Sequence, residues 1–245
     1  MSSNFTYRIF YLLIFLLGTI LGNAQNSQVQ FGKNRVQFHD FDWFEYDTDN
    51  FRVYWAGDAR NVGHAAIQMA EWDYREIQDI LEHKVNGRIS IIVYQDLTDL
   101  KQSNIGLEET FVNTGGQTKI VENKVFVYFN GDHQDLRRQV REGIAKVYIN
   151  NMMFGTNVQE IVQNAVLLNL PAWYSEGLAS YVGQTWSSDL DDELRGVFRS
   201  GKYDTFEELA RENPKLAGHS LWYYIDVNYG RKAASNLIYL TRINR

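Results

Sequence analysis

Two glutamates, each followed by a glycine, are the residues of this sequence best placed to do chemistry. Glu142 lies in the segment 136–148 and Glu176 lies in the segment 170–179, and both segments are predicted to be helical. A pair of carboxylates can transfer protons, for example to and from a glycosidic bond. Two other interpretations remain open, namely a structural ion cluster and two solvated surface charges.

The helices that carry these glutamates belong to a series of helices in the second half of the chain. From Asp135 onward, apolar residues repeat about every 3.6 positions, which is the helical period. Pro171 is a favourable residue just before the helix that carries Glu176, and Gly143 is predicted to allow close packing of the helix that carries Glu142. The predicted helices cover 135–153, 158–168, 172–183, 189–199, 205–212 and 218–242.

The first half of the sequence has the pattern of a mixed sheet. Three segments rich in β-branched and aromatic residues, 51–55, 88–94 and 124–129, are predicted strands. A helix over 59–83 separates the first two, because its apolar residues recur mostly at helical spacing. Strands followed by helices predict an α+β fold. We expect one domain over 25–245, rich in sheet over 25–130 and helical over 131–245.

The segment Trp173-Tyr174-Ser175-Glu176-Gly177-Leu178-Ala179 resembles the W-x-x-E-G-x-A helix of gluzincin-type metallopeptidases. Asp226–Gly230 is similar to the late helix of that family, which ends in a Tyr-Gly pair. More narrowly, the chain resembles the peptidase-MA-like module of exported bacterial proteins that is often fused to a TolB-like β-propeller. The resemblance implies a zincin-like α+β fold, with an N-terminal mixed sheet and a helix followed by an all-helical half.

The most specific motif of that family is degenerate in this chain. If Glu142 is the glutamate of H-E-x-x-H, the two histidine positions hold Arg141 and Ala145, and Glu176 holds the position of the third ligand. Arginine carries only donors and alanine has no lone pair, so neither can bind zinc. We therefore expect no catalytic residues, no metal and no cofactor, although the active relatives implied by the resemblance use zinc.

A positive side chain is expected to replace the charge of the lost metal. If the family geometry persists, Arg141 lies between Glu142 and Glu176, and these three residues form a structural ion cluster. An arginine partner would relieve the cost of burying two carboxylates. The guanidinium should then lie within about 5 Å of the carboxylates.

The five histidines offer no replacement ligand pair. No two of them are spaced four residues apart on one predicted helix, so we expect surface or ordinary hydrogen-bonding roles for each. Asp135 is predicted to cap the helix that begins near His133. The histidines are His39, His64, His83, His133 and His219.

Aromatic side chains make up 14% of the chain and gather densely in the run 41–46. One interpretation is a strand that packs on the sheet, and the other is an aromatic platform for carbohydrate or peptide. Trp222-Tyr223-Tyr224 has the apolar spacing of a buried helix and is predicted to lie in the core.

The N-terminus has the pattern of a secretory signal peptide. Arg8 precedes the apolar run 9–17, and the small residues Gly22 and Ala24 follow, which predicts cleavage after Ala24 and a signal peptide over 1–24. No later stretch is apolar enough to span a membrane. The net charge of −6 argues against nucleic acid as a partner, and the absence of cysteine excludes thiolate metal sites and disulfides.

Together these features predict an exported, catalytically inactive metallopeptidase-like module that binds or scaffolds proteins in the bacterial cell envelope. Its place would be the periplasm, the outer-membrane periphery or the exterior, and its partner would be an envelope protein or a C-terminal propeller domain. One alternative is a zinc-dependent peptidase with displaced ligands. The other is an envelope glycan-binding protein.

Overall fold

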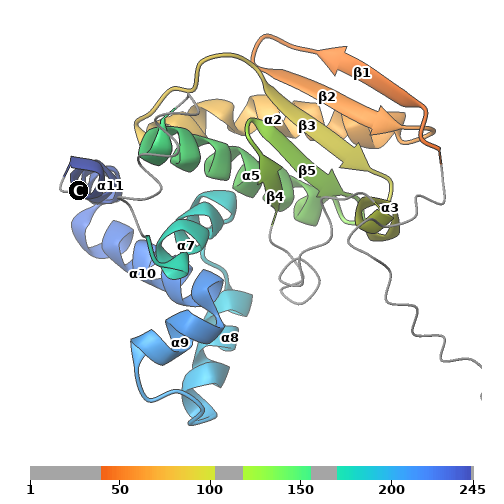
Figure 1. The fold of residues 1–245 in the computed structure, drawn as a ribbon. Coiled ribbons are helices and arrows are strands. Elements are labelled where there is room, and N and C mark those ends of the chain that lie inside the picture. The colour runs from red at the N-terminus through yellow and green to blue at the C-terminus, as the bar shows by residue number, and fades with distance from the viewer. Residues whose placement is uncertain (1–39, 103–117, 156–169, 244–245) are drawn as a thin grey trace, which may run out of the picture. The chain divides into compact units, whose positions relative to one another are not determined.

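The computed structural model describes residues 40–102, 118–155 and 170–243, all within the unit Val36–Arg245 (Figure 1). The predicted signal peptide and the predicted helix over 158–168 lie outside the described residues. The strands are β1 (Trp43–Asp47), β2 (Phe51–Ala56), β3 (Ile89–Tyr94), β4 (Lys119–Val121) and β5 (Lys124–Tyr128). The helices are α2 (Arg60–Leu81), α3 (Leu97–Gln102), α5 (His133–Phe154), α7 (Ala172–Gly183), α8 (Ser188–Arg199), α9 (Phe206–Glu212), α10 (Pro214–Tyr229) and α11 (Arg231–Ile243).

The described strands form one mixed sheet in the order β1-β2-β3-β5-β4. The three central strands β2, β3 and β5 are parallel, and each outer strand runs antiparallel to its neighbour. Because the strands come first in the chain and only helices follow β5 among the described residues, the predicted α+β class is confirmed. The sequence pattern did not predict the two short elements α3 and β4.

The main core lies between the sheet and the helices α2 and α5, which run along the same face of the sheet (Figure 1). Side chains of the central strands alternate between this face and the opposite one. Val53, Ile91 and Val125 face the main core. Ile92 and Phe126 point the other way and pack with α3 residues in a smaller cluster.

The largest difference from the prediction in the helical half lies near the C-terminal end of the described residues. A single helix was expected over 218–242, but the structure has α10 and α11, which are separated at Gly230. Gly230 adopts φ 84° and ψ 158°. This conformation ends a helix, and residues other than glycine rarely adopt it because of their Cβ atom. The prediction was wrong because apolar residues continue at helical spacing on both sides of the break.

Helices α7 and α10 meet at two glycines. A Cβ atom added to Gly177 would lie 2.3 Å from the Cα of Gly218, and one added to Gly218 would lie 1.9 Å from the carbonyl oxygen of Trp173. The two backbones are therefore in direct contact, with no room for a side chain at either position. This contact holds the Glu176 helix against α10.

Candidate functional site: a cation cluster on two glutamates

Glu142 lies in the middle of α5 and is fully buried. Residues four apart on a helix share a face, which places Arg138 and Lys146 on the same side of α5 as Glu142. Helix α7 packs closely against this side, because Gly183 faces the Glu142 side chain and its missing Cβ would lie only 3.0 Å from that of Glu142. The carboxylate is thus positioned by two helices packed at short range.

Positive groups from two helices hold the carboxylate of Glu142. Arg138 donates from Nη1 to Oε2 at 3.0 Å, and Lys215 of α10 donates to the same oxygen at 2.9 Å. The backbone N–H of Thr118, which precedes β4, lies 3.4 Å from Oε1. Hydrogen bonds from charged donors are the strong ones, so this arrangement compensates the cost of burying the charge.

Glu176 is linked to Glu142 through a lysine. The ammonium of Lys146 lies 2.8 Å from Oε2 of Glu176 and 3.9 Å from Oε1 of Glu142. The same ammonium donates to the carbonyl oxygen of Thr118 at 3.1 Å. Lys146 therefore stands between the two glutamates, at the position that the sequence analysis assigned to Arg141. We call Arg138, Glu142, Lys146, Glu176 and Lys215 the cation cluster.

Arg141 points to other partners, which corrects the predicted cluster of Arg141, Glu142 and Glu176. Its Nη1 lies 2.8 Å from both Asp73 and Glu76 of α2, and its Nε and Nη2 donate to the carbonyl oxygen of Val182 at the end of α7. Adjacent helical residues point about 100° apart, so Arg141 faces α2 while Glu142 faces α10. Among the described residues, Arg141 makes no ion pair with either predicted glutamate.

Arg141 belongs to a second buried charge group, between α2 and α5. Asp73 is 2% exposed and accepts two hydrogen bonds from Arg137, at 2.8 and 2.6 Å. Burial works to raise the pKa of Asp73, but the hydrogen bond from Arg137 and the charges of Arg141 and Arg137 outweigh it. The pKa of Asp73 is therefore held below its ordinary value.

The residues at the expected zinc position do not fit a zinc ion. Arg141 is engaged with α2, and Ala145 is a fully buried part of the apolar core. The carboxylates of Glu142 and Glu176 are instead paired with ammonium and guanidinium groups, which repel a divalent cation. Among the residues that the structure describes, no group of three or more His, Cys, Asp or Glu side chains is arranged to hold a metal ion.

Burial also affects two neighbouring groups of α10. It lowers the pKa of Lys215, although the attraction of Glu142 acts in the opposite direction. One helical turn later, His219 is fully buried, and its Nδ1 lies 3.0 Å from the hydroxyl of Ser180. Burial, and to a smaller extent the charge of Lys215, lower the pKa of His219 to about 3, so the ring is neutral at physiological pH.

The other described histidines have the ordinary roles that were expected. His64 packs against the rings of Tyr46 and Trp55, and His83 shares a hydrogen bond with Asn151. His133 packs edge to face on Phe129 at the start of α5. His39 lies outside the described residues.

The start of α5 differs slightly from the prediction. The capping side chain is Asp132, which accepts from the backbone N–H of Gln134. Asp135 was the predicted cap, but its carboxylate instead pairs with Arg138 and accepts from Asn130 and Gln139. Asp135 therefore orients the arginine that reaches Glu142.

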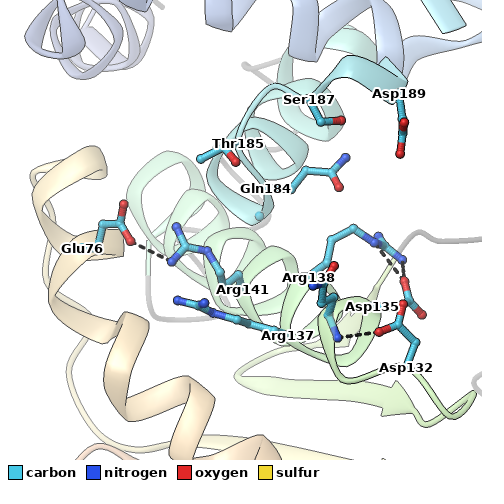
Figure 2. A pocket seen from close by; sticks show the side chains of 12 residues that line it. Glu76, Asp132, Asp135, Arg137, Arg138, Arg141, Gln184, Thr185, Ser187 and Asp189 are labelled. Atoms are coloured by element: carbon cyan, nitrogen blue, oxygen red, sulfur yellow. Dashed lines mark hydrogen bonds and ion pairs between the residues drawn. The ribbon is translucent and has the colours of Figure 1, made fainter. Parts of the chain in front are cut away.

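A polar cleft of about 570 Å³ opens beside the cation cluster (Figure 2). Its walls are the first half of α5, the end of α2, and the segment from the end of α7 to the start of α8. Figure 2 shows Gln184, Ser187 and Asp189 on one side of the cleft and the α5 side chains on the other. Neither Glu142 nor Glu176 lines it. Its charged lining residues are Glu76, Asp132, Asp135, Arg137, Arg138, Arg141 and Asp189.

The two lysines of the cation cluster were not predicted from the sequence. Lys146 was detectable, because it stands four residues after Glu142 on a predicted helix and so shares its face. Lys215 was not, because it lies 73 residues away from Glu142 and reaches it only through the packing of α7 on α10. Asp73, the partner of Arg141, is also far in sequence from the helix it contacts, since it lies 64 residues before Arg137.

No protein-family model matches this chain, and comparisons with curated proteins and with solved structures found no similar protein. The resemblance to gluzincin-type metallopeptidases therefore depends on the sequence motifs of α5, α7 and α10. No described helix is long and apolar enough to cross a membrane.

Proposed function

We propose that this chain is an exported, catalytically inactive metallopeptidase-like module, zincin-like in fold, which binds or scaffolds proteins in the bacterial cell envelope. The observation that carries the proposal is the cation cluster. Lysine ammonium groups form ion pairs with the two glutamates that would have to face a zinc ion and its water.

The cation cluster also argues for a structural role of these glutamates. Glu142 connects α5 with α10, and Glu176 connects α7 with α5 through Lys146. A charge network that joins three helices stabilises one arrangement of the domain, whereas an active metal site needs an open coordination position. These contacts support a structural, metal-free role for the two glutamates, as the proposed module requires.

The decisive measurement is the zinc content of the purified chain after incubation with excess zinc and dialysis against a weak chelator. We expect far less than one zinc per folded chain, measured by elemental mass spectrometry. Stoichiometric zinc, together with hydrolysis of a casein substrate, would contradict the proposal and support a zinc peptidase with displaced ligands.

A variant that rebuilds the motif gives the matched positive control. Arg141→His and Ala145→His supply the two missing imidazoles, and Lys146→Met removes the ammonium that lies between the glutamates. We expect this triple variant to bind about one zinc per chain, because its donor set becomes two histidines and one glutamate. The same triple variant with Glu176→Gln should bind zinc much more weakly. If the folded triple variant binds no zinc, the alignment of α5 and α7 with the family motifs is wrong.

A further inference from the structure

Strand β1 is the outermost strand of the sheet and pairs only with β2 among the described residues (Figure 1). All five of its residues are exposed. The predicted strand over the aromatic run 41–46 is thus present, but its rings are only partly covered. Trp43 is 42% exposed and Phe44 is 51% exposed.

The hydrogen bonds that flank β1 show which of its main-chain groups face outward. The N–H of Gly57 donates to the carbonyl of Asp42 at 3.0 Å, and the N–H of Thr48 donates to the carbonyl of Phe51 at 2.8 Å. In an antiparallel pair, bonded and unbonded residues alternate along each strand. The N–H and C=O groups of the even-numbered residues of this strand therefore point toward β2. The N–H and C=O groups of Trp43, Glu45 and Asp47 point away from the sheet.

Among the described residues, this edge carries few of the features that normally protect an edge strand, its two carboxylates, Glu45 and Asp47, being the exception. Natural edges are blocked by charged side chains, above all lysine, by proline, bulges or very short strands, or by a helix or loop that covers them. The β1 sequence Trp-Phe-Glu-Tyr-Asp has no lysine or proline, and its pairing with β2 runs without a bulge from Trp43 to Asp47. The opposite edge strand, β4, is only three residues long.

Ring surfaces flank the outward main-chain groups on both faces of the sheet. On one face Trp43 packs edge to face on Tyr94, with ring centroids 5.5 Å apart. On the other face Phe44 stacks on Trp55. A strand added beside β1 would find apolar contacts for its side chains on either face, which is what strand addition requires besides hydrogen bonds.

The charge of the edge indicates the chemistry of its partner. Asp47 is neutralised by Arg52 and Arg88, at 2.6 and 2.9 Å. Glu45, at the centre of the strand, makes no hydrogen bond or ion pair with another described residue. A directly opposite residue of positive charge would complement it.

We propose that β1 is the docking edge for an extended segment of a partner protein, which adds antiparallel to it with a lysine or arginine opposite Glu45. The proposal deepens the proposed function, on which it rests, by assigning the surface and the kind of partner. The outward groups of three alternate residues provide the main-chain bonds, and the flanking rings select apolar side chains at the neighbouring positions.

The test measures binding of a fluorescein-labelled peptide, Gly-Thr-Ile-Lys-Val-Thr-Gly, to the full chain by fluorescence anisotropy. We expect saturable binding that weakens about tenfold when the lysine amide of the peptide is N-methylated, because that amide would donate to Glu45. N-methylation of the valine should change the affinity little, since its amide would point away from β1. Equal effects of the two methylations would overturn the proposal.

Two variants of the chain test the same edge. Glu45→Pro removes an outward N–H without removing a hydrogen bond to β2, so the fold should persist while the peptide binds about tenfold more weakly. Glu45→Lys should weaken binding about threefold and reverse the preference toward a peptide with glutamate in place of lysine. Unchanged affinity of both folded variants would overturn the proposal.

The remaining outcomes distinguish this proposal from others. If light scattering shows a dimer of the wild-type chain that Glu45→Pro converts to a monomer, the occupant of the edge is a second copy and the proposal is wrong. Stoichiometric zinc in a chain that still binds the peptide through β1 would defeat the proposed function and leave the docking edge intact. Absence of both zinc and peptide binding would defeat the docking edge alone.

Discussion

Two buried carboxylates on opposite sides of α5 show two ways of placing a negative charge inside this protein. Asp73 of α2 is neutralised by arginines of a single helix, and one of them, Arg137, keeps 48% of its side chain exposed. Glu142 is fully buried, and its cations come from α5 and α10. The ammonium-bearing side chains of Lys146 and Lys215 are only 13% and 20% exposed.

The Glu142 group depends more on the tertiary structure than the Asp73 group does. The Asp73 group needs only the packing of α2 on α5, and water reaches one of its arginines. The Glu142 group needs three helices and the backbone of Thr118 in place at once. Removing one partner from a buried charge group is most costly where water cannot replace it.

Glu142→Gln should therefore produce the largest loss of stability. It leaves Arg138, Lys146 and Lys215 with one carboxylate fewer at the centre of the cluster, and we expect a loss of about 3–5 kcal/mol in the free energy of unfolding. Urea unfolding followed by circular dichroism measures it. Glu176→Gln is the matched control, and it should cost less because the Glu176 side chain is 25% exposed. A loss below about 1 kcal/mol for Glu142→Gln would show that the cluster is not structural.

Asp73→Asn should have a smaller effect, about 2 kcal/mol, because Arg141 keeps Glu76 and Arg137 can turn to water. The pKa of Asp73 is lowered in the folded state, so its contribution to stability is present above its ordinary pKa of 3.8. That contribution is lost as the pH falls through the lower folded value. The variant should thus lose less stability on acidification than the wild type. The measurement is the free energy of unfolding of both proteins between pH 5 and pH 2. An equal loss of stability in the two proteins would contradict this prediction.

His219, next to Lys215, provides the most specific effect, because at pH 7 it contributes no pH dependence and the effect appears only on acidification. The folded pKa of about 3 lies below the ordinary value of 6.5, so between these values the unfolded chain binds more protons than the folded chain. Stability should fall by up to about 1.4 kcal/mol for each pH unit of acidification across that window. His219→Gln removes this dependence. Unfolding curves at pH 4, 5 and 6 measure it, and identical slopes in the two proteins would contradict the assignment.

The sequence predicted the elements that have long, regular apolar patterns. The helix predicted over 172–183 has the bounds found for α7, and the close approach expected at Gly143 is confirmed, since a Cβ there would lie 2.1 Å from a methyl carbon of Val125. Short elements such as β4 and α3 have too few residues to show a period. The aromatic run Trp222–Tyr224 was only partly predicted, because Trp222 is buried while Tyr223 and Tyr224 are exposed.

The two anions of the candidate site, Glu142 and Glu176, were predicted from the sequence, but its cations were not. Glu142 and Glu176 do lie in one charge cluster, because α5 and α7 pack against each other. The choice of Arg141 as their cation was wrong, since adjacent residues of a helix do not share a face. Spacing within a helix could have identified Lys146. Only the three-dimensional packing shows Lys215, because its contact with Glu142 joins α10 to α5, which are far apart in the sequence.

The contact between Gly177 and Gly218 limits how this sequence can change. Each of the two positions excludes a methyl group because the other backbone stands in its way. Substitutions elsewhere in a core can often be rescued by a smaller residue across the contact, but here both residues are already the smallest available. In a saturation mutagenesis library selected for folded protein, both positions should therefore keep only glycine, and no second substitution within the pair should restore the variants that are lost.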